Sequence, residues 1–293
     1  MNSISQLVRK AARTAQVHIP HLQNAGKAFE AAIRSATGKL HDPDLEGLRS
    51  VQIPPGALFL DIGANRGSAA LSFWRIAPNC KIICFEPNAP LADRFLRPIE
   101  RRGAIVHKIA LGDEPGQFPL YVPVYNGVVF DGLASLNKVE AAQWLSERTL
   151  FGFQPQKLQV MEQICEVVCL DSFNLDPFFI KIDVQGREAA VIKGGLGTIA
   201  RALPIIFAES ESLDIDSVTN MLRPLEYDYY AYDGKALVRG RFSRSNIYLI
   251  PQTRAVSKLA DSQIWRRGRF SLGDSLEEDR GWGLRIRMTC ASG

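Results

Sequence analysis

Short apolar runs alternate with segments of helical spacing through the middle of the chain, and this alternation predicts an α/β fold. The first clear run, LFLD at 58–61, is apolar up to its aspartate, as in a strand buried on both faces of a parallel sheet. A glycine turn follows, and residues 66–74 then carry apolar side chains at helical spacing. A strand, turn and helix of this kind hold nucleotide-like ligands at the carboxyl end of a sheet.

The same unit recurs further along the chain. Additional strands are predicted at 81–85, 104–109, 166–170, 177–183, 204–209, 227–232 and 246–250, with an edge strand at 117–122 that contains Pro119. Helices are predicted at 89–101, at 139–150, from 189 to the glycines at 194–195, and at 215–223. Residues 123–138 are interpreted as a loop over the site, whereas residues 151–165 fit more than one element.

Charge divides the chain into three parts. Residues 1–50 and 251–293 each carry a net charge of +3, whereas residues 51–250 carry −2. We therefore expect an N-terminal helical extension, an α/β domain at 51–250, and a C-terminal tail that is extended or partly disordered. Basic ends around a slightly acidic centre do not indicate a nucleic-acid partner. An enzyme that acts on nucleic acid more often has a stripe of basic residues near its reactive site.

Residues 3–15 predict a basic amphipathic helix. Its apolar face comprises Ile4, Leu7, Val8, Ala11, Ala12 and Ala15, and no acidic residue precedes Glu30. We expect this face to pack against the core or a partner subunit, with peripheral membrane contact as the alternative. The chain has neither an apolar run long enough to span a bilayer nor the pattern of a secretory signal, so a cytoplasmic location is expected.

Four predicted strands end in or beside a carboxylate. These residues are Asp61, Glu86, Asp183 and Glu209. If the strands are parallel, their carboxyl ends form one acidic edge of the sheet. Glu86 follows the glycine turn by about 20 residues, which is where a carboxylate binds the hydroxyl groups of a ribose.

The glycine turn distinguishes between ribose-containing ligands. A dinucleotide fingerprint that starts at Gly63 requires glycines at 65 and 68, where this chain has Asn65 and Ser68. The acidic Asp61 directly before the turn also disfavours a pyrophosphate. S-adenosylmethionine carries a sulfonium, an ammonium, a carboxylate and a ribose, and it suits an acidic turn with free backbone amides better.

Four segments, in this order and spacing, resemble the FkbM-type S-adenosylmethionine-dependent methyltransferases. They are LDIGANRG at 60–67, CFEPN at 84–88, ALGD at 110–113 and IKIDVQGRE at 180–188. The resemblance covers about 51–250. It implies a class I methyltransferase (Rossmann-like) α/β fold, a seven-stranded, mostly parallel sheet flanked by helices with its last strand antiparallel, and O-methylation of a saccharide, glycolipid or natural-product hydroxyl. The cofactor-binding residues that it implies are Asp61, Gly63, Ala64, Asn65, Gly67, Glu86, Pro87, Asn88, Ala110 and Leu111.

Asp183 is the first candidate for the base that accepts the proton of the acceptor hydroxyl, and Glu209 is the second. The family pattern at 183–186 is commonly Asp-Val-Glu-Gly, whereas this chain has Gln185. The missing negative charge weakens a divalent-metal site, so no metal ligands are assigned.

Two alternatives to the methyltransferase remain open at the level of sequence. One is an NAD-dependent oxidoreductase, which the absent fingerprint glycines disfavour. The other is a methyltransferase-like fold that serves as a binding module, which the intact turn and acidic edge disfavour. We expect the acceptor to contact residues 123–165, the N-terminal helices or the aromatic run 227–232, and a homo-oligomer is left open.

Overall fold

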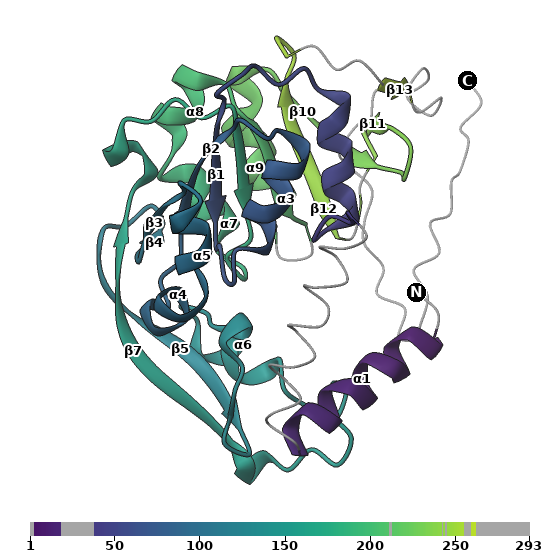
Figure 1. Cartoon of the computed structure of the whole chain (residues 1–293), viewed down its shortest axis with the longest axis vertical. Coiled ribbons are helices and arrows are strands. Elements are labelled where there is room, and N and C mark those ends of the chain that lie inside the picture. Colours follow the sequence, from purple (N-terminus) through teal and green to yellow (C-terminus); the bar gives the residue numbers. More distant parts are fainter. Residues whose placement is uncertain are drawn as a thin grey trace, which may run out of the picture. The chain divides into compact units, whose positions relative to one another are not determined.

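The computed structural model describes residues 3–18, 38–210, 213–241, 243, 245–254 and 259–261. A nine-stranded sheet forms the centre of the described chain, in the order β13-β11-β10-β12-β9-β8-β1-β2-β3 (Figure 1). Its strands are β1 (Leu58–Ile62), β2 (Lys81–Phe85), β3 (Ile105–His107), β8 (Phe179–Ile182), β9 (Ile205–Glu209), β10 (Tyr227–Tyr232), β11 (Leu237–Arg239), β12 (Asn246–Pro251) and β13 (Leu259–Asp261). The α/β architecture with a mostly parallel central sheet is confirmed.

The five strands β3, β2, β1, β8 and β9 are parallel to their neighbours. Their acidic residues at or near the carboxyl ends therefore share one edge of the sheet, as predicted. The late strand β12 lies antiparallel between β9 and β10. The expected count of seven strands is wrong because β11 and β13 extend the β10 side. Both are three-residue strands, too short for a periodic pattern to be recognised.

Helices cover both faces of this sheet. They are α3 (Ser68–Ile76), α4 (Ala89–Phe95), α5 (Arg97–Arg101), α7 (Glu188–Lys193), α8 (Leu196–Ala202) and α9 (Ile215–Leu222), with a 3-10 helix, η1, at Pro43–Ser50, whereas α6 (Lys138–Gln143) packs against β5 and β7 of the second sheet. Two predicted helices are corrected. The helix expected at 89–101 is divided at Leu96, before Pro98, which cannot donate a backbone hydrogen bond. The helix expected at 139–150 is only six residues long.

The buried runs in β1 and β8 contribute to two hydrophobic clusters, one on each face of the sheet. Phe59 and Phe179 pack with Phe73 of α3 in one cluster. Leu60 and Ile180 pack with residues of α7, α8 and α9 in the other. Burial on both faces is what a continuous apolar run predicts, and it fixes these two strands at the middle of the fold.

A second sheet stands beside the carboxyl edge. It has the order β4-β7-β5-β6 and consists of β4 (Ala110–Leu111), β5 (Gly116–Tyr125), β6 (Val128–Val129) and β7 (Leu158–Val168). Strands β5 and β7 form a long antiparallel pair that extends away from the central sheet (Figure 1). The segment that sequence left ambiguous therefore becomes mostly strand. The 3-10 helix η2 (Asp131–Leu133) and α6 connect β6 to β7.

The predicted N-terminal helix forms as α1 (Ser3–His18), but its packing face differs from the expected one. Leu7 and Val8 are 63% and 62% exposed, and the three alanines of the predicted apolar face are exposed as well. The contacts come from the C-terminal end of the helix, where Val17 is buried and Thr14 accepts a hydrogen bond from the backbone amide of Phe151. The expected packing of the apolar face against the core is therefore wrong. None of the described helices has both the length and the apolar character that a bilayer crossing requires.

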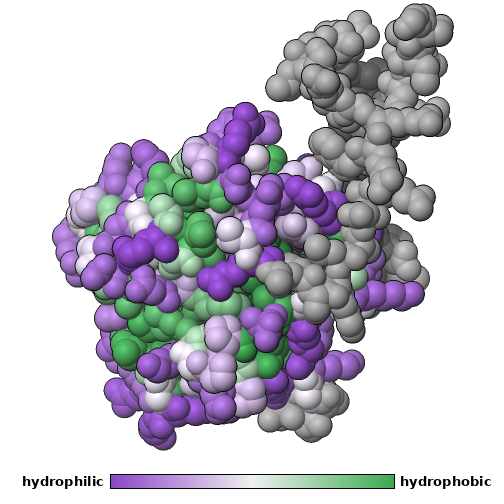
Figure 2. Space-filling view, turned by 90° about the horizontal axis from the view of Figure 1, so that it is seen from above, coloured by the Kyte–Doolittle hydropathy of each residue, from purple (hydrophilic) through white to green (hydrophobic). Residues whose placement is uncertain are grey.

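Apolar side chains are not confined to the interior. Figure 2 looks down on the molecule from above, and hydrophobic residues reach the surface there between hydrophilic ones. Among the described residues, exposed large apolar side chains include Val139, Trp144 and Phe151 near α6 and Met161 and Ile164 on β7.

Candidate functional site

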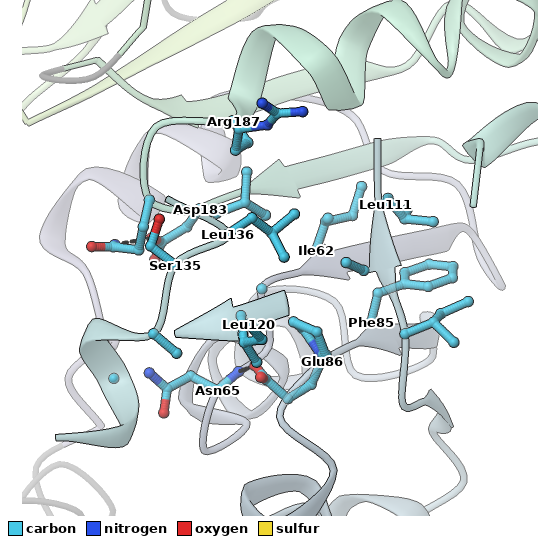
Figure 3. A pocket seen from close by; sticks show the side chains of 18 of the residues that line it. Ile62, Asn65, Phe85, Glu86, Leu111, Leu120, Ser135, Leu136, Asp183 and Arg187 are labelled. Carbon is cyan, nitrogen blue, oxygen red and sulfur yellow. Dashed lines mark hydrogen bonds between the residues drawn. The ribbon is translucent and has the colours of Figure 1, made fainter. Parts of the chain in front are cut away.

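A cavity of about 110 Å³ lies at the carboxyl edge of the central sheet, between that edge and the second sheet. Figure 3 shows Asn65 and Glu86 along one part of it and Asp183 with Ser135 along another. The wall is apolar where Phe85, Ile109 and Leu111 line it, and polar at the ends of β1, β2 and β8. The cavity thus combines an apolar wall with a few converging polar groups, as small-molecule sites do.

The glycine turn after β1 is fixed by backbone hydrogen bonds to β2. The amides of Gly63 and Ala64 both donate to the carbonyl of Phe85, at 2.9 and 3.0 Å. Gly63, Asn65 and Gly67 all have positive φ angles, which glycine adopts without strain and asparagine tolerates better than most residues. The turn leads into α3, and Gly67 is its N-cap residue.

Gly63 cannot be replaced without disturbing the neighbouring strand end. A Cβ atom at this position would lie 1.9 Å from the backbone oxygen of Asp183. We expect Gly63→Ala to lower the free energy of unfolding well beyond the roughly 1 kcal/mol that a positive φ costs an alanine. Gly56→Ala is the matched control, because Gly56 has nearly the same φ angle but no atom within 4 Å of the added Cβ. Equal losses in denaturant unfolding would contradict a steric requirement at Gly63.

Glu86 links the turn after β1 to the turn after β2. Its carboxylate accepts hydrogen bonds from the amides of Asn65, at 2.7 Å, and Asn88, at 2.9 Å. Burial raises the pKa of Glu86 to about 7, although these two hydrogen bonds oppose the shift. Glu86 is therefore a buried carboxylate that changes charge near neutral pH, at the place where sequence predicts a contact with ribose hydroxyls.

Asp61 and Lys181 form a buried ion pair beneath the turn. They are register partners in the parallel strands β1 and β8, so their side chains leave the sheet on the same face. Lys181 Nζ lies 3.2 Å from Asp61 Oδ1 and 3.4 Å from Asp183 Oδ2, and it donates a hydrogen bond of 2.9 Å to the carbonyl of Gly63. Among the described residues, neither Asp61 oxygen accepts a well-formed hydrogen bond, so charge holds this carboxylate in place.

The two aspartates differ in their access to the cavity. The Asp61 side chain is 0% exposed and does not line the cavity, whereas that of Asp183 is 42% exposed and does. Burial raises the pKa of Asp61, and the positive charge of Lys181 opposes that shift. Of the two carboxylates, only Asp183 is thus in a position to meet a ligand directly.

The turn between β8 and α7 is stabilised by its own side chains. The side-chain amide of Gln185 donates a hydrogen bond of 3.1 Å to the carboxylate of Asp183. Glu188 accepts hydrogen bonds from the backbone amides of Val184 and Gly186, at 3.0 and 3.2 Å. A glutamine at 185 therefore donates a hydrogen bond to Asp183, which a second carboxylate at this position could not do.

A strap from the second sheet, residues 131–136, forms the remaining wall. At one end, Arg66 pairs with Asp131 at 2.6 Å and stacks on the ring of Phe95. At the other end, Ser135 donates a hydrogen bond of 3.0 Å to Glu140, whose carboxylate lies next to the space beside Gly186. The strap is thus attached to the β1 turn by an ion pair, and through Glu140 it lies close to the β8 turn.

Seven of the twelve site residues that were predicted from the sequence line the cavity. These are Gly63, Asn65, Glu86, Pro87, Ala110, Leu111 and Asp183. The other five do not line it: Asp61, Ala64, Gly67, Asn88 and Glu209. Sequence did not nominate Phe85, Leu120, Ser135, Leu136 or Arg187, which do line it. Phe85 and Arg187 lie in segments that carry the family resemblance, and Ser135 and Leu136 lie in the segment interpreted as a loop over the site, but no role was assigned to any of them. Arg187 is exposed, and its guanidinium points away from Asn65 and Glu86 (Figure 3).

A larger, open hollow of about 680 Å³ lies at the amino ends of β1 and β2 and beside Phe178. Its Arg254 guanidinium stacks on Phe178 and donates hydrogen bonds to the carbonyls of Ala202 and Leu203. Because these groups already support the fold, we assign the functional site to the smaller cavity, where carboxylates and a positive-φ turn converge.

Comparisons with known proteins gave matches that cover most of the α/β domain. The sequence pattern of the methyltransferase FkbM domain matches residues 61–229, a range that includes the β1 turn, Glu86, Asp183 and Glu209. The 2-O-methyltransferase NoeI of Sinorhizobium fredii is 28% identical over 191 residues, which are 61% of this chain and 73% of NoeI.

Two further similar proteins are much longer than the matched region. The AMB antimetabolite synthetase AmbE of Pseudomonas aeruginosa is 24% identical over 267 residues, which are 78% of this chain and 12% of AmbE. The solved structure of the methyltransferase FkbM from Methylobacillus flagellatus aligns with a TM-score of 0.43 at 16% identity, over 68% of this chain and 44% of that one.

Proposed function

The chain belongs to the methyltransferase FkbM family, and from this premise we propose that it is an S-adenosylmethionine-dependent O-methyltransferase whose acceptor is a hydroxyl of a saccharide, glycolipid or natural product. The observation that carries the proposal is the convergence of the positive-φ glycine turn, Glu86 and Asp183 on one cavity. The 2-O-methyltransferase NoeI, a relative at modest identity, supports oxygen as the methylated atom.

The chemistry of the cavity fits this cofactor. Glu86 presents a carboxylate that suits a ribose, Phe85, Ile109 and Leu111 offer an apolar wall for adenine, and Asp183 suits a cationic amino acid moiety. S-adenosylmethionine supplies an electrophilic methyl group to such a site. The cavity is smaller than the roughly 300 Å³ at which ligand pockets begin, so it would have to widen to admit the whole cofactor.

Methyl transfer to a hydroxyl depends mainly on positioning. The acceptor oxygen has to lie in line with the methyl group, and its proton has to leave as the new bond forms. Asp183 is our proposed base, because it is the partly exposed carboxylate of the cavity and its contacts with Gln185 and Lys181 hold it in place there. Glu209 ends the neighbouring strand and remains the second candidate.

Binding calorimetry tests the cofactor directly. We expect the full chain to bind S-adenosylmethionine and S-adenosylhomocysteine but not NAD. Binding of NAD alone would replace the proposal with an oxidoreductase, and binding of none of the three would favour a non-catalytic module. Glu166→Gln, on the exposed face of β7, is a suitable control and should bind like the unmodified chain.

A panel of saccharides, lipid-linked saccharides and hydroxylated natural products, assayed with labelled S-adenosylmethionine, then tests the acceptor class. Transfer of the label to a carbon or nitrogen atom, with none to oxygen, would contradict O-methylation.

A further inference from the structure

Lys181 is a buried lysine at the centre of the site, and ion pairing with Asp61 does not account for all of its contacts. Asp183 lies two residues further along the chain and thus on the same side of β8, and it continues the line of β8 at the carboxyl edge. The ammonium group therefore faces three oxygen atoms: one of Asp61, one of Asp183 and the carbonyl of Gly63. Asp61 lies in β1 itself, Gly63 in the turn after β1, and Asp183 in the turn after β8.

Burial alone would remove the charge of such a lysine, since taking an ammonium group out of water favours its neutral form. Here the two aspartates outweigh burial, and the pKa of Lys181 is raised. The lysine is therefore charged; it donates a hydrogen bond to the Gly63 carbonyl and is attracted to both carboxylates by charge. Together with Asp61 and Asp183 it forms a trio with a net charge of −1.

Building on the proposed function, we propose that Lys181 is a positioning residue for the cofactor. It neutralises Asp61, holds the carbonyl of Gly63 and orients Asp183, so that the β1 turn and the β8 turn keep one relative arrangement. Asp183 is then the carboxylate that remains open to the cavity, and the trio presents a single negative charge to a cationic ligand. Asp61 would act on the cofactor only through Lys181.

Two observations separate this role from simple neutralisation of Asp61. The shortest contact of Lys181 is with the Gly63 carbonyl rather than with either carboxylate. The Gly63 turn also touches the β8 turn so closely that a Cβ atom on Gly63 would meet the Asp183 backbone. The ammonium group of Lys181, which lies between these two turns, therefore holds them in position relative to each other in addition to balancing the charge of Asp61.

The test compares stability with cofactor affinity in a charge-balanced variant. Asp61→Asn combined with Lys181→Met removes the buried pair together, and the melting temperature should stay within a few degrees of the unmodified chain. We expect S-adenosylhomocysteine to bind this double variant about ten-fold or more weakly, as for the loss of a charge-assisted hydrogen bond. The single variant Lys181→Met should lose both stability and affinity. The pair Asp93→Asn with Lys108→Met removes an exposed ion pair and should change neither quantity.

The possible results are distinguishable. A double variant that is stable and binds S-adenosylhomocysteine with unchanged affinity would show that Lys181 only neutralises Asp61, and would overturn the proposal. A double variant that fails to fold would overturn it too, because the two charges would then not balance each other. If the unmodified chain binds neither S-adenosylmethionine nor its product, the proposed function itself fails, and the same experiment shows it.

Discussion

Asp61→Asn is expected to lower the free energy of unfolding by about 3 kcal/mol, which is the lower end of the cost of breaking a buried ion pair. The substitution leaves the buried ammonium of Lys181 without its nearest charged partner, at 3.2 Å. Asp183 remains as a second, more exposed partner at 3.4 Å, and for this reason we expect the lower end of that range. Urea unfolding followed by circular dichroism measures the change.

Asp93→Asn provides the control for this experiment. Asp93 pairs with Lys108 at 2.6 Å, but both side chains are exposed, so the pair is screened by water. We expect no measurable loss of stability there. A change below about 1 kcal/mol at Asp61 would mean that the buried pair contributes no more than a surface pair, which would remove the basis for the role of Lys181.

Cofactor affinity is expected to rise with pH through neutrality, and Glu86→Gln is expected to abolish this dependence. Because the pKa of Glu86 is raised to about 7, the group is mainly protonated at pH 6 and mainly ionised at pH 8. Ribose hydroxyls donate to the ionised form, so S-adenosylhomocysteine should bind about ten-fold more weakly at pH 6 than at pH 8. Calorimetry over this range, on the unmodified chain and the variant, gives both curves.

The same pKa shift has the opposite effect on folding. A carboxyl group with a raised pKa holds its proton more tightly in the folded than in the unfolded chain. The stabilising contribution of Glu86 is thus fully present below about pH 4.5 and is lost as the pH rises toward 7.

Glu166→Gln is the control for the binding experiment, because replacing this exposed carboxylate should leave the pH dependence of binding intact. A pH dependence that persists in Glu86→Gln would assign the titrating group elsewhere.

The edge of the sheet that carries the site could be predicted because its signals are local. Four buried strands are short apolar runs that end in or beside an acidic residue, and such runs favour parallel strands with their carboxyl ends together. The glycine turn at Gly63, where φ is positive, and the departure from a dinucleotide fingerprint at Asn65 also depend only on residues adjacent in the sequence. The family resemblance depends on the same short segments, and the matched range confirms it.

The second sheet and the strap could not be read in this way. Residues 151–165 carry no single period, because β7 is exposed along much of its length and only part of one face is apolar. Ser135 is placed by its pairing with Tyr121 of β5, and Glu140 lies beside Gly186 of the β8 turn, so residues that are distant along the chain come together. Likewise, the amphipathic pattern of α1 predicted a helix but not the face by which it packs.

The sequence by itself determined that a glycine turn and a row of acids stand at one edge of a parallel sheet, since strand periodicity and turn chemistry are properties of neighbouring residues. Only the tertiary structure decided which acid is open to a ligand. The register of β1 with β8 places Lys181 beside Asp61, which buries that aspartate in an ion pair and leaves Asp183 at the cavity. This distinction depends on burial and on charges from another strand, and neither can be predicted from a local sequence pattern.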